Sequence, residues 1–256
     1  MLSLSGAIHT AWAAYQRNWK LWIPLGVLSA LLMLIPLLIF VVSLEQGKPC
    51  STLTQCTSAA WQSLHYTPSG ILMRQMHTIF SLGTAILMPG LMATALKDAR
   101  GERPHWSDFW GAYHWRRLSI WVRQAIYSGR FIMLGLLCFV VPGCILYAGF
   151  FFSGWLVLAA PRFPEGIKRT RLAIASLKAS WGLTKGMRWD LFAILWLLFL
   201  FQGIAYLSCG LFNIMFTPLS VLTEASLFYQ CLAKDPGLVE RWATTDSRLV
   251  RSELRS

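Results

Sequence analysis

The chain has 256 residues, of which 55% are hydrophobic and only 13% are charged, and its mean hydropathy is +0.51. Soluble domains average about 25% charged residues, so the composition excludes a soluble globular protein and indicates an integral membrane protein. The net charge of +12 does not indicate nucleic-acid binding, because the Lys and Arg residues punctuate apolar tracts and are not gathered on a polar surface. We therefore expect the lipid bilayer and its anionic headgroups as partners, and no nucleic acid.

Residues 1–20 have the pattern of an amphipathic helix that lies in the membrane interface. Its large apolar side chains follow one another at steps of three or four, which is the spacing of one helical stripe: Leu4, Ile8, Trp12, Tyr15 and Trp19. Two later segments, near 104–117 and 167–185, have similar patterns, and Ser107 is the expected N-cap of the first of them. We expect Trp12, Trp115 and Trp181 at the headgroup boundary.

Six apolar tracts between residues 21 and 232 are expected to cross the bilayer, which takes roughly 20 apolar residues per helix. They are 21–44, 71–96, 124–141, 144–160, 191–208 and 211–232. Only Pro142-Gly143 lies between the third and fourth tracts, and only Cys209-Gly210 lies between the fifth and sixth. We therefore expect a tight turn at each break, and two helical hairpins. The alternative is one long kinked helix per pair, but a helix over 124–160 would be far longer than a membrane is thick.

The distribution of basic residues predicts the orientation, because Lys and Arg beside the spans are retained on the cytoplasmic side. The N-terminal segment carries two, the 97–123 loop six, the 161–188 loop seven and the tail from 233 onward five. The opposite side has only Lys48 in its loop, with Arg74 just inside the next span. Both termini are therefore expected in the cytoplasm, and the membrane is expected to be the bacterial inner membrane.

The expected fold class is all-α, a polytopic membrane protein with six transmembrane helices in hairpins and amphipathic interfacial helices on the cytoplasmic side. In domain terms, we expect an interfacial helix over 1–20, a six-span membrane domain over 21–232 and a cytoplasmic basic tail over 233–256. Small residues such as Gly149, Ser153 and Gly154 are expected to allow close helix contacts.

No pattern in the sequence indicates an enzyme. The five histidines form no H-E-x-x-H pair and stand near no cysteine at zinc-ligand spacing, and phosphate-loop, nucleophile-elbow and dinucleotide fingerprints are absent. We expect no catalytic residue, no metal and no cofactor. Cys50 and Cys56 both fall in the outer loop of about residues 45 to 70. The compartment that this loop faces can be oxidising, so a disulfide and two free thiols remain alternatives.

Two charged residues lie deepest in the apolar tracts: Arg130 in the third and Glu224 in the sixth. Measured from the expected outer ends, they lie at roughly 17 and 20 Å along helices that rise about 1.5 Å per residue. Charged groups at such depths usually pair with one another or mark a transport pathway. The sequence therefore predicts an Arg130–Glu224 pair between the two hairpins; the alternative is that both side chains snorkel toward the headgroups.

Several short motifs carry a resemblance to a known family. They are Lys97-Asp98-Ala99-Arg100-Gly101-Glu102 with Asp108-Phe109, then Val141-Pro142-Gly143, then the run from Ala175 to Gly186. Over residues 7 to 232 the chain resembles the six-span bacterial membrane proteins of unknown function that are grouped with the membrane domain of glycerophosphoryl diester phosphodiesterases. The resemblance implies a compact six-helix bundle. It implies no phosphodiesterase activity, because in those enzymes a separate soluble barrel performs the catalysis.

These observations predict a non-enzymatic inner-membrane bundle that assists, scaffolds or assembles with another membrane protein. The alternative is a small transporter or lipid-handling protein with a polar site between its spans. A scaffold is expected to pair its intramembrane polar groups internally, whereas a transporter is expected to leave some of them facing a wet cavity.

Overall fold

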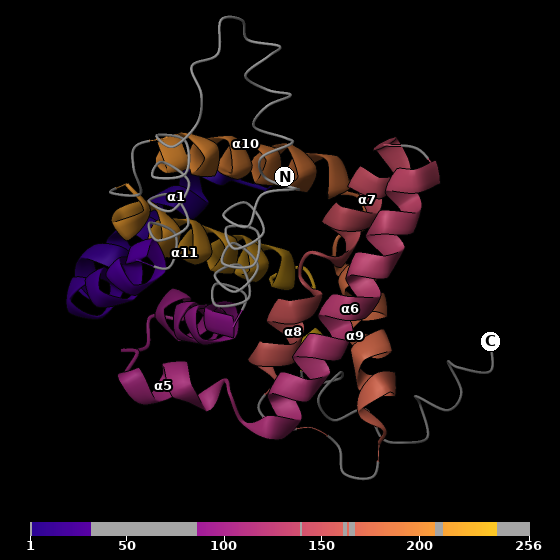
Figure 1. Ribbon diagram of the computed structural model, residues 1–256, viewed down its shortest axis with the longest axis horizontal. Coiled ribbons are helices and arrows are strands. Elements are labelled where there is room, and N and C mark those ends of the chain that lie inside the picture. Colours follow the sequence, from indigo (N-terminus) through magenta and orange to yellow (C-terminus); the bar gives the residue numbers. More distant parts are fainter. Residues whose placement is uncertain are drawn as a thin grey trace, which may run out of the picture.

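The computed structural model describes residues 2–31, 86–138, 140–160, 163, 167–207 and 212–239. The elements of this part of the chain are helices and it contains no strand, so the predicted all-α class is confirmed. The labelled helices are α1 (Leu4–Arg17), α5 (Trp106–Gly111), α6 (Trp115–Cys138), α7 (Val140–Phe150), α8 (Ser153–Ala159), α9 (Arg169–Leu183), α10 (Arg188–Leu207) and α11 (Asn213–Leu232) (Figure 1). Two further helices cover Trp19–Leu31 and residues 86–99.

The first helix, α1, begins where the Ser3 hydroxyl accepts a hydrogen bond from the backbone N–H of Gly6 at 3.1 Å, and it packs against α11. Its buried face is made of small residues, Ala7, Ala11 and Ala14, together with Tyr15. The rest of the predicted apolar stripe is mostly outside, since Ile8, Trp12 and Trp19 are exposed and Leu4 is half-buried. Alanines allow two helices to approach closely, so the bulky side chains of α1 remain on the molecular surface.

The segment that follows the 86–99 helix differs from its prediction in two ways. The short helix α5 begins at Trp106, so His105 and not Ser107 is its N-cap, and the Asp108 carboxylate accepts from the His105 backbone N–H at 2.8 Å. This acidic residue at the third helical position satisfies an N–H group that has no partner within the helix. The interfacial segment expected near 104–117 is therefore divided between α5 and the first turn of α6.

The predicted hairpin of the third and fourth tracts is present, because α6 folds back to pack along α7. The predicted position of the turn is wrong: α6 ends at Cys138 and α7 begins at Val140, which places Pro142 and Gly143 inside the first turn of α7. Proline fits there because the first helical N–H groups have no intrahelical acceptor. Gly143 serves close packing, since a Cβ on Gly135 of α6 would lie 3.0 Å from the Gly143 Cα atom.

The second predicted hairpin also has its two helices in contact, because α10 packs against α11. The expected turn at Cys209-Gly210 lies outside the described residues. In Figure 1, α10 and α11 run across one half of the molecule, and α6 to α9 occupy the other half. α10 also contacts α7, which joins the two halves.

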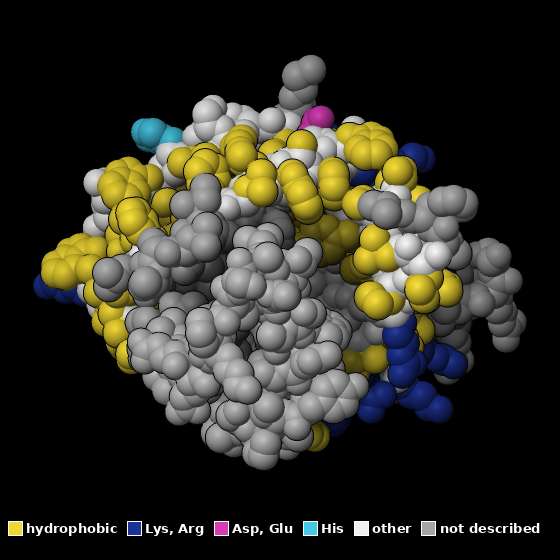
Figure 2. Space-filling view, turned by 45° about the horizontal axis from the view of Figure 1, so that its top comes forward, with side chains coloured by type: hydrophobic (Ala, Val, Ile, Leu, Met, Phe, Trp, Pro, Cys, Tyr) yellow, Lys and Arg dark blue, Asp and Glu magenta, His cyan; other side chains and the backbone are white. Residues whose placement is uncertain are grey.

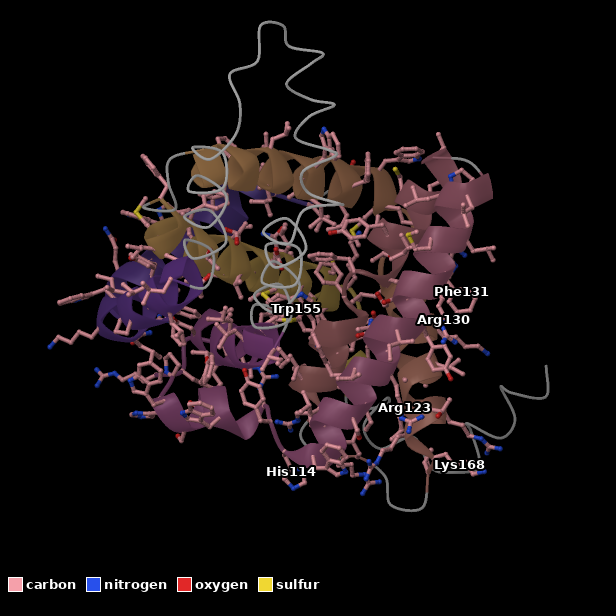
Figure 3. The ribbon with its side chains drawn as sticks, viewed as in Figure 1. His114, Arg123, Arg130, Phe131, Trp155 and Lys168 are labelled. Atoms are coloured by element: carbon pink, nitrogen blue, oxygen red, sulfur yellow. The ribbon has the colours of Figure 1, made fainter. Side chains whose placement is uncertain are left out.

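Large aromatic side chains fill the main core, and a smaller core lies beside the N-terminal part of α6. Phe228 of α11 packs between Phe152 and Trp155, with ring centroids 5.5 and 6.3 Å away. Figure 3 shows Trp155 near the centre of the molecule. The smaller core is formed by α6, α8, α9 and the residue after α8: Ile120, Val157, Ala160, Leu172 and Ala173.

Much of the described surface is apolar. Figure 2 shows hydrophobic side chains across the upper part of one face, with Lys and Arg side chains gathered at its lower right. In the described part of the chain, one stretch, Val141–Ala159, is long and apolar enough to cross a membrane, and Trp19–Leu31 is a shorter apolar helix. The stretch covers α7 and α8, which are separated by the non-helical Phe151 and Phe152.

Candidate functional site

A buried carboxylate, that of Asp98 at the end of the 86–99 helix, accepts hydrogen bonds from three side chains. Its Oδ1 atom accepts from the Arg17 guanidinium and from Asn18 Nδ2 at 2.8 Å, and its Oδ2 atom accepts from Trp22 Nε1 at 2.7 Å. Arg17 also donates to the Asp98 backbone carbonyl at 2.7 Å. The Asp98 side chain is fully buried, whereas that of Arg17 is 43% exposed. The site therefore fixes the junction of α1 and the Trp19–Leu31 helix to the 86–99 helix.

The residues on either side of Asp98 extend this polar junction to two more helices. Lys97 Nζ donates to Asp108 Oδ1 of α5 at 2.6 Å. Arg100 lies over the ring of Tyr229 on α11, 5.6 Å from its centroid, and the Tyr229 hydroxyl donates to the Leu96 carbonyl at 3.2 Å. The motif from Lys97 to Glu102 thus connects the end of the 86–99 helix to four other helices: α1, the Trp19–Leu31 helix, α5 and α11.

Asp108 has a lowered pKa. Burial alone would raise the pKa of this carboxyl, but hydrogen bonds from Lys97 and from the His105 backbone, with the charges of both residues, outweigh burial. Its side chain is 15% exposed. The carboxylate is consequently kept ionised, as its role in holding α5 against Lys97 requires.

A second polar contact joins α6 to α8. Gln124 Nε2 donates to the Ser153 hydroxyl at 2.6 Å, and the hydroxyl in turn donates to the Phe150 carbonyl. A Cβ on Gly154 would lie 3.1 Å from Trp121 Nε1, so the helices approach closely here, as predicted from the small residues. The Trp121 N–H itself has no hydrogen-bond partner in the described structure.

Gly149 of α7 is a third point of close approach. The Ser180 hydroxyl of α9 donates to the Gly149 carbonyl at 2.8 Å, and a Cβ on Gly149 would overlap the Trp181 ring. Arg188 covers the Trp181 ring at 3.4 Å from its centroid and donates to the Trp181 carbonyl at 2.9 Å. Trp181 is therefore half-buried between helices, while Trp12 and Trp115, also expected at the headgroup boundary, are exposed.

The structure does not bring Arg130 and Glu224 together. Arg130 is exposed on α6, and Figure 3 shows it on the outer side of that helix. Glu224 is half-buried on α11, and no ion pair joins the two among the residues that the structure describes. The other predicted pair, Cys50 and Cys56, lies outside the described residues.

The sequence does not predict the carboxylate site around Asp98. Its motif stands out, but hydropathy patterns carry no information on contacts between residues 76 to 81 positions apart. One signal was present: Asp98 closely follows an apolar tract, where a carboxylate requires a cation or several donors.

Comparison with known proteins gives no relative: no family model, curated protein or solved structure matches the chain. The described geometry defines an all-helical protein whose polar junctions are structural. Among the described residues, no group of three or more His, Cys, Asp or Glu side chains is placed to hold a metal ion.

Proposed function

We propose that the chain is a polytopic inner-membrane protein with six spans and both termini in the cytoplasm, and that it acts as a scaffold, assembly or accessory bundle without enzymatic activity. The observation that supports this best is the apolar character of both faces of α10. Leu191, Ile194 and Leu195 are buried against the molecule, yet the opposite side exposes another apolar set: Trp189, Trp196, Leu197, Leu200 and Phe201. A helix that is apolar on its outer face as well suits a lipid environment.

The same proposal includes membership of the six-span family that the sequence resembles. The proposal rests on the short motifs of the sequence. In this fold the motif residues Lys97, Asp98 and Asp108 take part in one polar junction that holds helices together.

The paired polar contacts support a scaffold over a transporter. Gln124 with Ser153, and Ser180 with Gly149, satisfy their polar groups between helices. Such internally satisfied contacts specify helix packing, and these particular groups are not free to bind a cargo.

A transporter or lipid-handling protein is the second candidate, and α11 is the element that favours it. Thr217 and Ser226 of this helix have buried hydroxyl oxygens without a hydrogen-bond partner in the described structure, and Glu224 lies between them in sequence. Unpaired polar groups within an apolar helix are the feature expected beside a transport pathway.

Two measurements test the proposal. Alkaline carbonate treatment of membranes is expected to leave the full chain in the pellet, and its release would overturn membrane insertion. Native mass spectrometry after gentle extraction then separates the candidates: a retained protein partner supports the scaffold, whereas a retained small molecule supports the transporter.

A further inference from the structure

A group of basic side chains lies where the beginning of α6 meets the beginning of α9. We call it the basic cluster, and its members are Arg117, Arg123, Lys168 and Arg169. Arg123 Nη1 donates to the Thr170 hydroxyl of α9 at 3.1 Å, and Arg117 Nη2 donates to the Ala160 carbonyl at 3.0 Å. Arg169 lies over the ring of the exposed Trp115, 5.8 Å from its centroid. Figure 3 shows Arg123 and Lys168 at the same end of the molecule.

The basic cluster lacks acidic neighbours on its own elements. Neither α6, α8 nor α9 contains an Asp or Glu residue. The ion pairs of the described residues, Arg17–Asp98 and Lys97–Asp108, do not include a member of the cluster. Lys168 directly precedes α9, and the carboxylate nearest to it in sequence, Glu165, lies outside the described residues. Four cations on helices without a carboxylate, or next to such a helix, are expected to attract an anion.

The helices that carry the basic cluster are packed together by a hydrophobic core. The smaller core, with Ile120, Ala160 and Leu172 among its members, lies beneath the cluster and is contributed by the same part of the fold. Because α6 packs against α8 and α9 at this core, the backbones that carry the cations are held in fixed positions. The points from which the charged side chains extend are thereby set before any ligand arrives.

An exposed apolar face continues along α6 from the basic cluster. Its side chains are Ile126, Phe131, Met133, Leu134 and Leu137. From Arg123 to Leu137 the helix rises roughly 21 Å, which exceeds the thickness of one hydrocarbon leaflet, about 15 Å. Arg130 lies within this apolar stretch of α6, and its long side chain can reach toward the cluster.

We propose that the basic cluster binds the phosphate of an anionic phospholipid whose acyl chains lie along the exposed apolar face of α6. The guanidinium groups match phosphate geometry, and the exposed Trp115 beside Arg169 supplies an indole ring, which favours the headgroup layer. This inference rests on the proposed membrane insertion and adds a specific lipid site to it.

The test measures the binding of lipids to the full chain in detergent by native mass spectrometry. The probes are phosphatidylglycerol and phosphatidylcholine with identical acyl chains. In Arg123→Gln/Lys168→Gln/Arg169→Gln, the affinity for phosphatidylglycerol is expected to fall by about 100-fold, since each Lys or Arg contributes about 1 kcal/mol near an anionic surface. Binding of phosphatidylcholine is expected to stay unchanged.

A matched control removes the same charge elsewhere. Lys20, Arg103 and Lys185 are exposed and lie outside the cluster, so Lys20→Gln/Arg103→Gln/Lys185→Gln is expected to keep the preference for phosphatidylglycerol. Equal losses in both triple variants would overturn the proposed site, and so would an unchanged preference in the cluster variant. Should the cluster variant not fold, Lys168→Glu changes one exposed position of the cluster and is expected to weaken binding of phosphatidylglycerol. An unchanged preference for phosphatidylglycerol in Lys168→Glu, or a loss no larger than that of the control variant, would overturn the proposed site.

Two further arms separate the alternatives. Displacement of phosphatidylglycerol by equimolar free glycerol 3-phosphate would identify a soluble phosphate ligand and overturn the lipid assignment. Carbonate extraction of the cluster variant distinguishes the two proposals: a variant that stays in the membrane but keeps its lipid preference contradicts the lipid site alone.

Discussion

Asp98 shows how one residue can control the stability of several helices. It is buried, and both of its oxygens accept hydrogen bonds from the segment Arg17 to Trp22. Asp98→Asn removes the charge that Arg17 faces and converts an acceptor into a donor beside Asn18 or Trp22. Breaking a buried ion pair costs about 3 to 5 kcal/mol, and we expect the lower end because the exposed part of Arg17 can be rehydrated.

The measurement for Asp98→Asn is thermal unfolding in detergent, followed by tryptophan fluorescence. Glu102→Gln is the control, because this exposed carboxylate lies in the same segment and its change is expected within about 0.5 kcal/mol. A loss in Asp98→Asn no larger than in the control would contradict the structural role of the buried carboxylate.

Asp108 predicts a pH dependence. Its pKa is lower in the folded protein than in the unfolded chain, so its contribution to stability is complete above the unfolded pKa of about 4 and is lost as the pH falls through the folded pKa. Unfolding midpoints of the wild type and of Asp108→Asn should therefore differ by a constant amount near neutral pH and converge below about pH 4. A difference that grows on acidification would contradict this assignment.

Arg130 and Glu224 allow a test of whether these two deeply placed charges interact. Because the structure places Arg130 on the outer side of α6, Arg130→Gln and Glu224→Gln are expected to change the folded yield independently. The double variant should then show the sum of the two single effects. Recovery of yield in the double variant would instead reveal the ion pair that the sequence predicted.

At the scale of helices, close packing depends on particular small residues. Gly149→Ala would place a methyl group into the Trp181 ring, and we expect a loss of about 1 to 3 kcal/mol because overpacked contacts force the neighbours to move. Gly182→Ala is the matched control, since a Cβ there meets nothing within 4 Å and alanine is the better helix former. The measurement is the thermal unfolding midpoint of each variant. Equal midpoints would contradict the close contact between Gly149 and the Trp181 ring.

The sequence predicted the helices better than it predicted how they end and meet. Periodicity and apolar length indicated α1, α10, α11 and the hairpin of α6 and α7. The turn was misplaced because proline is as compatible with the first turn of α7 as with a loop. For α1, the large apolar residues were expected at the membrane interface, and nothing in the sequence indicated that Ala7, Ala11 and Ala14 form the face that packs against α11. Only knowledge of the partner helix reveals which face it covers.

For the whole molecule, the basic-residue count predicts that the loops with Ser107 and Thr170 face the cytoplasm. Single cysteines at these positions, in a variant without the native cysteines, should be protected from an impermeant thiol reagent in intact cells. A cysteine in the 45–70 loop is the positive control and should react. Labelling at Ser107 or Thr170 in intact cells would reverse the predicted topology.

The two ends of the described chain meet, and this has a consequence for biosynthesis. The Ser3 backbone N–H donates to Gln230 Oε1 at 2.9 Å, and Gln230 Nε2 donates to the Ser3 carbonyl at 3.1 Å, across 227 positions of sequence. A ribosome makes α1 about 200 residues before its packing partner α11, so α1 remains without the surface that buries its alanines until α11 has been made. The exposed Ile8 and Trp12 give it an apolar edge with which to rest on the membrane during that time. α1 can therefore complete its native contacts only after α11 has been translated.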